Sequence, residues 1–139
     1  MLYTYTNQIQ ELAVNDNVVF NTTGIQTGCT VTHNAGEAVI NLNRHGFYMI
    51  HFNADFNAPS AGVVNFQLYK NGIAVNGAEA SSYIQGAGYV ENASFSVIVR
   101  VKGTTCACDT SNMNTSIVVR NIGVSSIVTN AAITITKIA

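Results

Sequence analysis

Acidic, imidazole and hydroxyl side chains could act as acids, bases or nucleophiles, but their spacing in this chain forms no catalytic motif. His33, His45 and His51 lie far apart, and no G-x-S-x-G elbow surrounds a serine. The seven carboxylates include no close pair along the sequence that would indicate a catalytic dyad. They are Glu11, Asp16, Glu37, Asp55, Glu79, Glu91 and Asp109. We therefore predict no catalytic residue and no cofactor.

Three cysteines could hold a metal ion or form cross-links. Cys106 and Cys108 are separated by one residue, which places both thiols on the same side of an extended segment. A structural zinc site generally needs four ligands, and only Cys29 and Asp109 stand out as further ligands. Cross-links between chains are a second alternative in an oxidising setting. Free, inert thiols are the simplest interpretation, because cysteine commonly packs as a small apolar residue, and we expect no metal site.

The charge content of the chain restricts its partners. The 139 residues carry a net charge of −1, and only 9% of them are charged whereas 47% are hydrophobic. Ordinary soluble domains are about 25% charged. Because lysine and arginine are scattered along the sequence, we expect no nucleic-acid-binding surface. A neutral surface of this kind is less unusual if an oligomer buries much of it, or if the protein is displayed outside a cell.

The ends and the apolar segments of the chain restrict its location. No apolar run is long enough to span a bilayer, so no membrane segment is expected. Residues 1–8 lack the basic and apolar regions of a signal peptide. The protein then stays where it is made or leaves by another route, such as inside a virus particle released by lysis. Residues 1–8 could also serve as an attachment tail that orders on docking, followed by a single domain over residues 9–139.

Short segments of alternating apolar and polar residues predict strands, and no segment shows sustained helical periodicity. The clearest strand runs from Phe47 to Phe56, with an apolar inward face and an outward face free of lysine and arginine. Other strands are predicted at Ile9–Val14, Val18–Phe20, Cys29–His33, Glu37–Asn43, Ser94–Lys102, Thr115–Asn121 and Ala131–Ile138.

A tight hairpin is predicted in the middle of the chain. Val63 to Lys70 alternates in polarity, Asn71 and Gly72 follow directly, and Ile73 to Val75 begins a new strand. Asn-Gly between two such runs is a strong signal for a type I′ turn, because both residues tolerate positive φ. The strand number, the chain length and this hairpin fit an all-β, two-sheet antiparallel jelly-roll sandwich.

A loop is expected to follow the hairpin, from Gly77 to Tyr89. Tyr83, Gln85 and Tyr89 lie in it among glycine and serine, a composition typical of adaptable binding surfaces. These three residues are the best candidates for a ligand-facing surface. An ordinary solvated loop is the alternative.

Several motifs resemble the jelly-roll superfamily of tumour necrosis factor and C1q. Gly46–Ala54 resembles the G-x-Y-x-I-x-F/Y-x-A strand of that superfamily, and Phe66–Gly72 resembles its F-x-L-x-x-N-G strand and turn. The closing strands at Thr115–Asn121 and Asn130–Ile138 resemble a bacterial and phage branch. This branch includes C-terminal domains of spore-surface collagen-like proteins and small stand-alone phage proteins. The absence of a Gly-X-Y stalk disfavours the spore-surface role. The chain also has no tryptophan and no acidic calcium-loop cluster, so a C1q-type calcium site is not carried over.

The resemblance implies a homotrimer whose axis is lined by the sheet containing Phe47–Phe56, Ser94–Lys102 and Ala131–Ile138. The outward sides of these strands carry small or neutral side chains, which allow close approach without desolvating charge. The expected interface residues are Met49, His51, Asn53, Ser96, Ile98, Ala132 and Thr134. Three copies of His51 could bind a metal or an anion or respond to pH, although a hydrogen-bonded interface histidine is the simpler interpretation.

The resemblance also leads to an expected function. The chain would be a non-enzymatic virion structural protein, a trimeric head-fibre or decoration knob assembled in the bacterial cytoplasm and exposed on the phage surface. Its partners would then be other capsid or fibre proteins. A receptor- or glycan-binding module, on a virion or a bacterial surface, is the alternative, and a structural or signalling domain of a cell-surface coat is a third.

Overall fold

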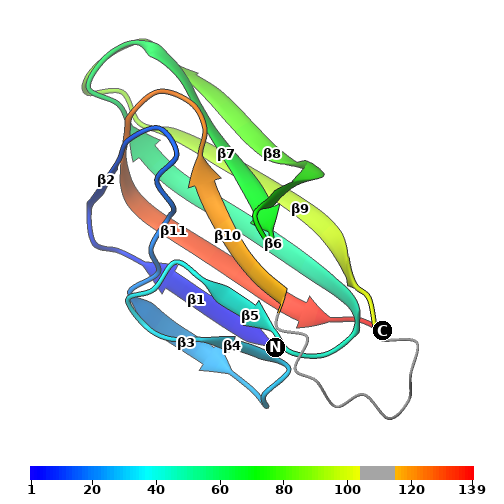
Figure 1. The fold of residues 1–139 in the computed structure, drawn as a ribbon. Helices are drawn as coiled ribbons and strands as arrows, with labels where there is room; N and C mark the ends of the chain where they lie inside the picture. The colour runs from blue at the N-terminus through cyan, green and yellow to red at the C-terminus, as the bar shows by residue number, and fades with distance from the viewer. Residues whose placement is uncertain (104–114) are drawn as a thin grey trace.

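The computed structural model describes residues 1–103 and 115–139, and this part of the chain folds into eleven β-strands (Figure 1). It contains no helix with the length and apolar character needed to cross a membrane. The strands are β1 (Leu2–Thr6), β2 (Gln10–Leu12), β3 (Thr22–Gln26), β4 (Val31–His33), β5 (Ile40–Leu42), β6 (Gly46–Asn57), β7 (Gly62–Lys70), β8 (Ile73–Ile84), β9 (Glu91–Val101), β10 (Thr115–Asn121) and β11 (Ser126–Lys137). Cys106, Cys108 and Asp109 lie outside the described residues.

The strands form two antiparallel sheets that pack face to face. The six-stranded sheet has the order β3-β1-β11-β6-β9, with β2 also paired to β11. The five-stranded sheet has the order β4-β5-β10-β7-β8. Strands far apart in sequence are neighbours in both sheets, as β1 and β11 show in Figure 1. This arrangement confirms the predicted two-sheet jelly-roll sandwich.

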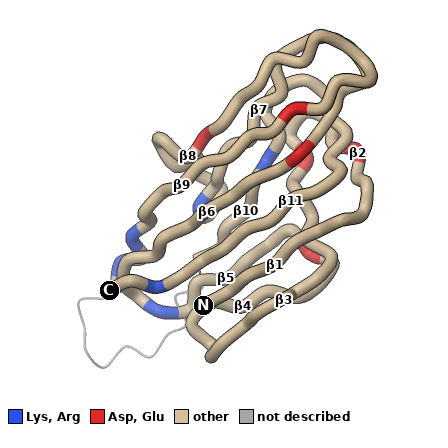
Figure 2. Tube along the Cα trace, turned by 180° about the vertical axis from the view of Figure 1, so that it is seen from behind, with Lys and Arg blue, Asp and Glu red and all other residues tan. Residues whose placement is uncertain are grey.

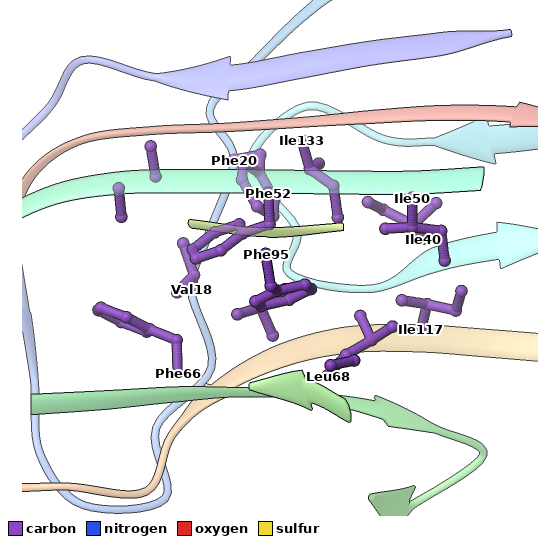
Figure 3. Packing of buried hydrophobic residues seen from close by; sticks show 14 of the residues in the cluster. Val18, Phe20, Ile40, Ile50, Phe52, Phe66, Leu68, Phe95, Ile117 and Ile133 are labelled. Carbon is purple, nitrogen blue, oxygen red and sulfur yellow. The ribbon is translucent and has the colours of Figure 1, made fainter. Parts of the chain in front are cut away.

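The core lies between the two sheets and follows from the period of two along each strand. In β6, Tyr48, Ile50 and Phe52 are fully buried, while the residues between them face outward. Phe52 packs against Phe66 of β7 and Phe95 of β9, with ring centroids 5.6 and 5.2 Å apart (Figure 3). Aromatic pairs at such distances add to the gain from burial, so this cluster ties the two sheets together.

The hairpin between β7 and β8 has the predicted turn. Asn71 and Gly72 have φ values of 50° and 79°, as a type I′ turn requires. The Asn71 side chain adds a link to the neighbouring strand, because its Oδ1 accepts a hydrogen bond from the backbone N–H of Ser116 at 2.8 Å. The turn therefore fixes the registers of β7, β8 and β10.

The N-terminal segment differs from the expected attachment tail over residues 1–8. Leu2–Thr6 form β1, which lies between β11 and β3 and pairs with both strands. Leu2, Thr4 and Thr6 face the core and are almost fully buried. Burial of Leu2 and the main-chain hydrogen bonds to two neighbours make this segment part of the sandwich. Strand β3 was also not predicted.

The expected loop from Gly77 to Tyr89 is wrong over its first half, because β8 continues to Ile84 and pairs with β7. Ala78 and Ile84 are fully buried and anchor this part of β8. Gly77 has a φ of 82°, near an irregularity in the β7–β8 register, and the Gln67 side chain donates a hydrogen bond to the carbonyl of Ala78 there. Gly77 therefore lies at a bulge within a long strand, although its presence in the sequence suggested a loop.

Four of the predicted strands are shorter than expected or absent, and two of them, Ile9–Val14 and Cys29–His33, are reduced to β2 and β4. Val18–Phe20 forms no strand and contributes an isolated bridge at Phe20, next to another at Asn17. The strand expected at Glu37–Asn43 is reduced to β5. Val18 and Phe20 are nevertheless fully buried, so this segment fills the core without pairing along its length.

Candidate oligomer interface

The seven residues expected at an interface lie together on the outer face of the six-stranded sheet. We call this set, Met49, His51, Asn53, Ser96, Ile98, Ala132 and Thr134, the neutral face. The strands β11, β6 and β9 that carry it are adjacent in the sheet. Their alternation places the neutral face on the side opposite the core.

The strand registers make the neutral face continuous. Met49 is the direct cross-strand partner of Ile98, and His51 is the partner of both Ser96 and Thr134. Asn53 pairs in the same way with Ala132. Direct cross-strand neighbours on one face have Cβ atoms about 5 Å apart, so the seven side chains form one patch.

The neutral face includes one pair of exposed apolar side chains. Met49 is 47% exposed and Ile98 is 55% exposed, and the two lie side by side. Exposed apolar pairs surrounded by small neutral residues are typical of a surface that packs against another protein. The single chain leaves this pair uncovered.

His51 is held in place on the neutral face by a neighbour. Its Nδ1 and the Oγ of Ser96 form a hydrogen bond across the β6–β9 pair. His51 remains exposed on this outward face of β6. The hydrogen bond is present in the single chain, whereas the interface role of His51 stays a prediction. No group of three or more metal-binding side chains occurs within residues 1–103 and 115–139 of one chain.

Two tyrosines extend the neutral face and were not predicted. Tyr3 pairs with Thr134, and Tyr5 pairs with Ala132, so both side chains continue the rows of the patch onto β1. Their rings stack with centroids 5.6 Å apart and planes at 29°. Gly24 of β3 lies beneath them, where an added Cβ would come within 3.0 Å of the Tyr3 ring. The alternation Leu2-Tyr3-Thr4-Tyr5-Thr6 was the available signal, since period two predicts a strand here.

The three residues of the proposed ligand-facing surface are exposed but lie on different elements. Tyr83 is 61% exposed on β8 and pairs with Val63 of β7, which is 48% exposed. Gln85 and Tyr89 are exposed beyond the end of β8, and Tyr89 is 53% exposed. The tyrosines therefore lie on and beside the β7–β8 edge of the five-stranded sheet.

Within residues 1–103 and 115–139, the other reactive side chains lie apart from one another. His33 is nearly buried, where its Nδ1 lies 3.0 Å from Thr23 Oγ1 and its Nε2 lies 2.9 Å from the Glu37 carbonyl. His45 is exposed, as expected for a turn. Cys29 is a free, exposed thiol. These contacts make His33 a structural residue that links β4 to β3 and to the turn before β5.

A shallow cavity of about 370 Å³ lies at the end of the sandwich between β2 and the start of β11. Glu11 and Asp16 contribute carboxylates to its wall, and Pro59 and Ile127 contribute apolar surface. One Asp16 oxygen already accepts a hydrogen bond from the backbone N–H of Ala13 at 2.9 Å. The Asp16 carboxylate therefore closes a local turn, and this cavity does not combine groups from both sheets around a reactive centre.

Comparison with solved structures identifies the fold. Over 99% of this chain and 92% of the other, it matches Eiger TNF from S. frugiperda with a TM-score of 0.73 at 9% identity. Murine APRIL at pH 5.0 matches with a TM-score of 0.62 at 8% identity, over 95% of this chain and 96% of the other. PRD1 vertex protein P5 matches with a TM-score of 0.54 at 15% identity, over 99% and 96%.

Sequence comparison adds no relative, since no family model and no curated protein matches the chain. At 8–15% identity, the structural matches bear on the fold and leave individual residue roles to the geometry above. The chain has the two-sheet jelly-roll fold of the tumour necrosis factor-like structures, as its motifs indicated.

Proposed function

We propose that the protein is a non-enzymatic structural protein that works as a homotrimer, with the neutral face turned toward the three-fold axis. The observation that carries this proposal is the exposed Met49–Ile98 pair within a continuous patch that contains no charged side chain. Burying such a patch removes apolar area from water and requires no desolvation of charge. Stable interfaces of this type bury more than about 2,000 Å² in total.

The number of subunits follows from the resemblance of the motifs to the tumour necrosis factor and C1q superfamily. A closed ring also explains why a face with so little charge can exist on a soluble particle, because each copy hides the face of its neighbours. Tyr3 and Tyr5 belong to the proposed contact, where large aromatic side chains contribute strongly to interface energy.

The trimer is tested by a charged residue on the neutral face. Ile98→Asp places a carboxylate in the proposed dry contact, and we expect monomers or insoluble protein. His51→Glu has the same expected result. Ile73→Asp is the matched control, because Ile73 is 73% exposed on β8 of the other sheet and should leave the trimer intact. Unchanged trimer mass of Ile98→Asp and His51→Glu in native mass spectrometry would reject the choice of face.

We further propose that the trimer is a head-fibre or decoration knob on the surface of a phage virion. The charge-poor surface and the phage-branch motifs support this placement, and one protein of the same fold carries the name of a vertex protein. Antibody labelling of purified particles in the electron microscope tests it. Label on the particle surface is expected, and recovery of the protein only in the particle-free fraction would contradict it.

A receptor- or glycan-binding module is the second candidate, favoured by the exposed tyrosines. Tyr83 and its neighbour Val63 present an aromatic and an aliphatic side chain together, and Tyr89 lies exposed nearby in the sequence. Such groups can stack on a sugar ring. A specific signal on a glycan array that Tyr83→Ala or Tyr89→Ala abolishes would favour this function over a purely structural one.

A further inference from the structure

The basic side chains are concentrated at one end of the sandwich, although they are scattered in the sequence. Figure 2 shows most of the blue segments toward the C-terminus and one apart from them, nearer the middle of the sandwich. We call this group of five of the six lysines and arginines, Arg44, Lys70, Arg100, Lys102 and Lys137, the basic end. Sequence spacing alone missed this cluster, because antiparallel strands bring together residues that are up to 93 positions apart.

Contacts and strand registers confirm that the basic end is one surface. Gly46 pairs with Val101, which places Lys102 beside the start of β6. The Lys137 side chain lies against Gly46, where an added Cβ would come within 2.6 Å of its Cε. Lys70 Nζ donates a hydrogen bond of 2.9 Å to the carbonyl of Arg100.

Carboxylates gather at the opposite end of the same strands. Asp55 and Glu91 lie where β6 and β9 meet at that end, and Glu11 and Asp16 line the cavity beside β2. Gly46 and Asp55 are nine positions apart along β6, which corresponds to about 30 Å. Charges are screened within about 8 Å at physiological ionic strength. A partner that approaches one end of the sandwich therefore meets mainly positive or mainly negative charge. The net charge of −1 for the whole chain does not give the local charge at either end.

We propose that the basic end is the docking surface of the protein and that it binds an acidic segment of a protein partner. Two apolar side chains accompany the cations, Phe47 with 42% exposure and Ile138 with 48%. The Arg100 guanidinium lies 5.8 Å from the centre of the Phe47 ring. Arginine beside an exposed aromatic ring is typical of protein-binding hot spots, whereas a nucleic acid is bound mainly by cations that follow its phosphates.

This inference deepens the proposed function and rests on it for the trimer, which would bring three basic ends to one side of the particle. Threefold repetition strengthens binding to a multivalent acidic surface without any new contact. The acidic end would then face away from the docking partner. Electrostatic docking of this kind accelerates association and weakens as salt is added.

The test measures binding of a fluorescent poly-glutamate peptide to the intact protein by fluorescence anisotropy. We expect binding at about 20 mM salt and its loss at about 500 mM salt, where charges are screened within a few ångströms. The triple variant Arg44→Gln, Lys102→Gln, Lys137→Gln should bind at least about tenfold more weakly. Arg100 and Phe47 stay unchanged because they border the neutral face.

The matched control changes the net charge equally at the acidic end, with Ser60→Glu, Ala61→Glu and Ser125→Glu, all at exposed positions. It should bind like the wild type.

Absence of binding by the wild type at low salt, or equal weakening in the control, would overturn the proposal. Tighter binding of a DNA duplex than of poly-glutamate would overturn the assignment to a protein partner, and head-to-tail self-association at low salt would replace it with a second copy. Native mass spectrometry of the wild type and the triple variant shows whether each is a trimer. Weaker peptide binding by a variant that is still a trimer reports on the basic end, whereas a wild type that is not a trimer contradicts the proposed function instead.

Discussion

At the scale of single residues, the polar groups inside this sandwich hold strands and turns in place. Tyr48 is fully buried, and its hydroxyl donates a hydrogen bond of 2.6 Å to the carbonyl of Arg44. Asn121 is fully buried and bonds to three backbone groups, one at the end of β2 and two in the turn that follows β10. Buried side chains that satisfy backbone groups are costly to remove, because the partner loses its hydrogen bond without gaining water.

Tyr48 gives a prediction about alkaline pH. Burial raises the pKa of Tyr48 above its usual value of 10.0, while the hydrogen bond to Arg44 and the charge of Arg44 lower it by less. The folded protein therefore keeps this proton at a pH where the unfolded chain releases it. The resulting stabilisation is fully present below pH 10 and declines as pH rises through the folded-state pKa.

Tyr48→Phe should remove this contribution together with the hydrogen bond. We expect the variant to lose about 1 kcal/mol in the free energy of unfolding near neutral pH. The difference from the wild type should shrink above pH 10. Urea unfolding of both proteins across this range measures the difference, and a constant difference would show that the Tyr48 proton is not linked to folding.

Asn121 gives a second prediction at this scale. Its Nδ2 donates to the carbonyls of Leu12 and Val124, at 3.1 and 2.9 Å, and its Oδ1 accepts from the N–H of Gly123 at 3.0 Å. Asn121→Ala leaves these groups without partners, and we expect a loss of about 2–4 kcal/mol. Asn76→Ala, at an exposed position, should cost less than about 0.5 kcal/mol in the same urea titration. Equal costs would contradict a structural role for Asn121.

At the scale of strands, the position of β1 separates an integral element from a tail. Leu2→Ala should lower the free energy of unfolding by about 2–5 kcal/mol, because Leu2 is fully buried between the sheets. Gln8→Ala is the exposed control and should change it by less than about 0.5 kcal/mol. If Leu2→Ala unfolded at the same urea concentration as the wild type, the segment would behave as an attachment tail.

The sequence predicted strands well where alternation was long and the turn chemistry was specific. Phe47–Phe56 alternates over ten residues and forms most of β6, and Asn71-Gly72 forms the predicted turn. β1 was missed because its inward positions include threonines, Thr4 and Thr6, which look polar although they are buried. The predicted strand ended before the true end of β8, because glycine and serine usually indicate a loop. In the structure, Gly77 lies at a bulge and the serines lie on an edge strand.

The residues of the candidate surfaces could be predicted only in part, because some of them are brought together by pairing between distant strands. All seven residues of the neutral face share strands whose alternation is evident in the sequence. The position of Tyr3 and Tyr5 beside the neutral face depends on the pairing of β1 with β11, and β11 lies near the opposite end of the chain. The basic end depends in the same way on pairings between distant strands, which no local pattern encodes.

At the scale of the whole molecule, two surfaces have different proposed roles. The neutral face runs along one sheet and would join three copies, while the basic end lies at one end of the same strands and would dock the assembly. The two surfaces share β6, whose central outward residues belong to the neutral face and whose first residues border the basic end. Trimer formation would therefore align three basic ends in one direction, as a particle-bound knob requires.

Sedimentation velocity of the purified protein at micromolar concentration tests the central claim most directly. We predict a single species with three times the 14.8 kDa mass of the chain, and an Ile98→Asp variant that does not form it. A well-behaved monomer of the wild-type protein would contradict the account, because it would show that water covers the neutral face instead of two further copies.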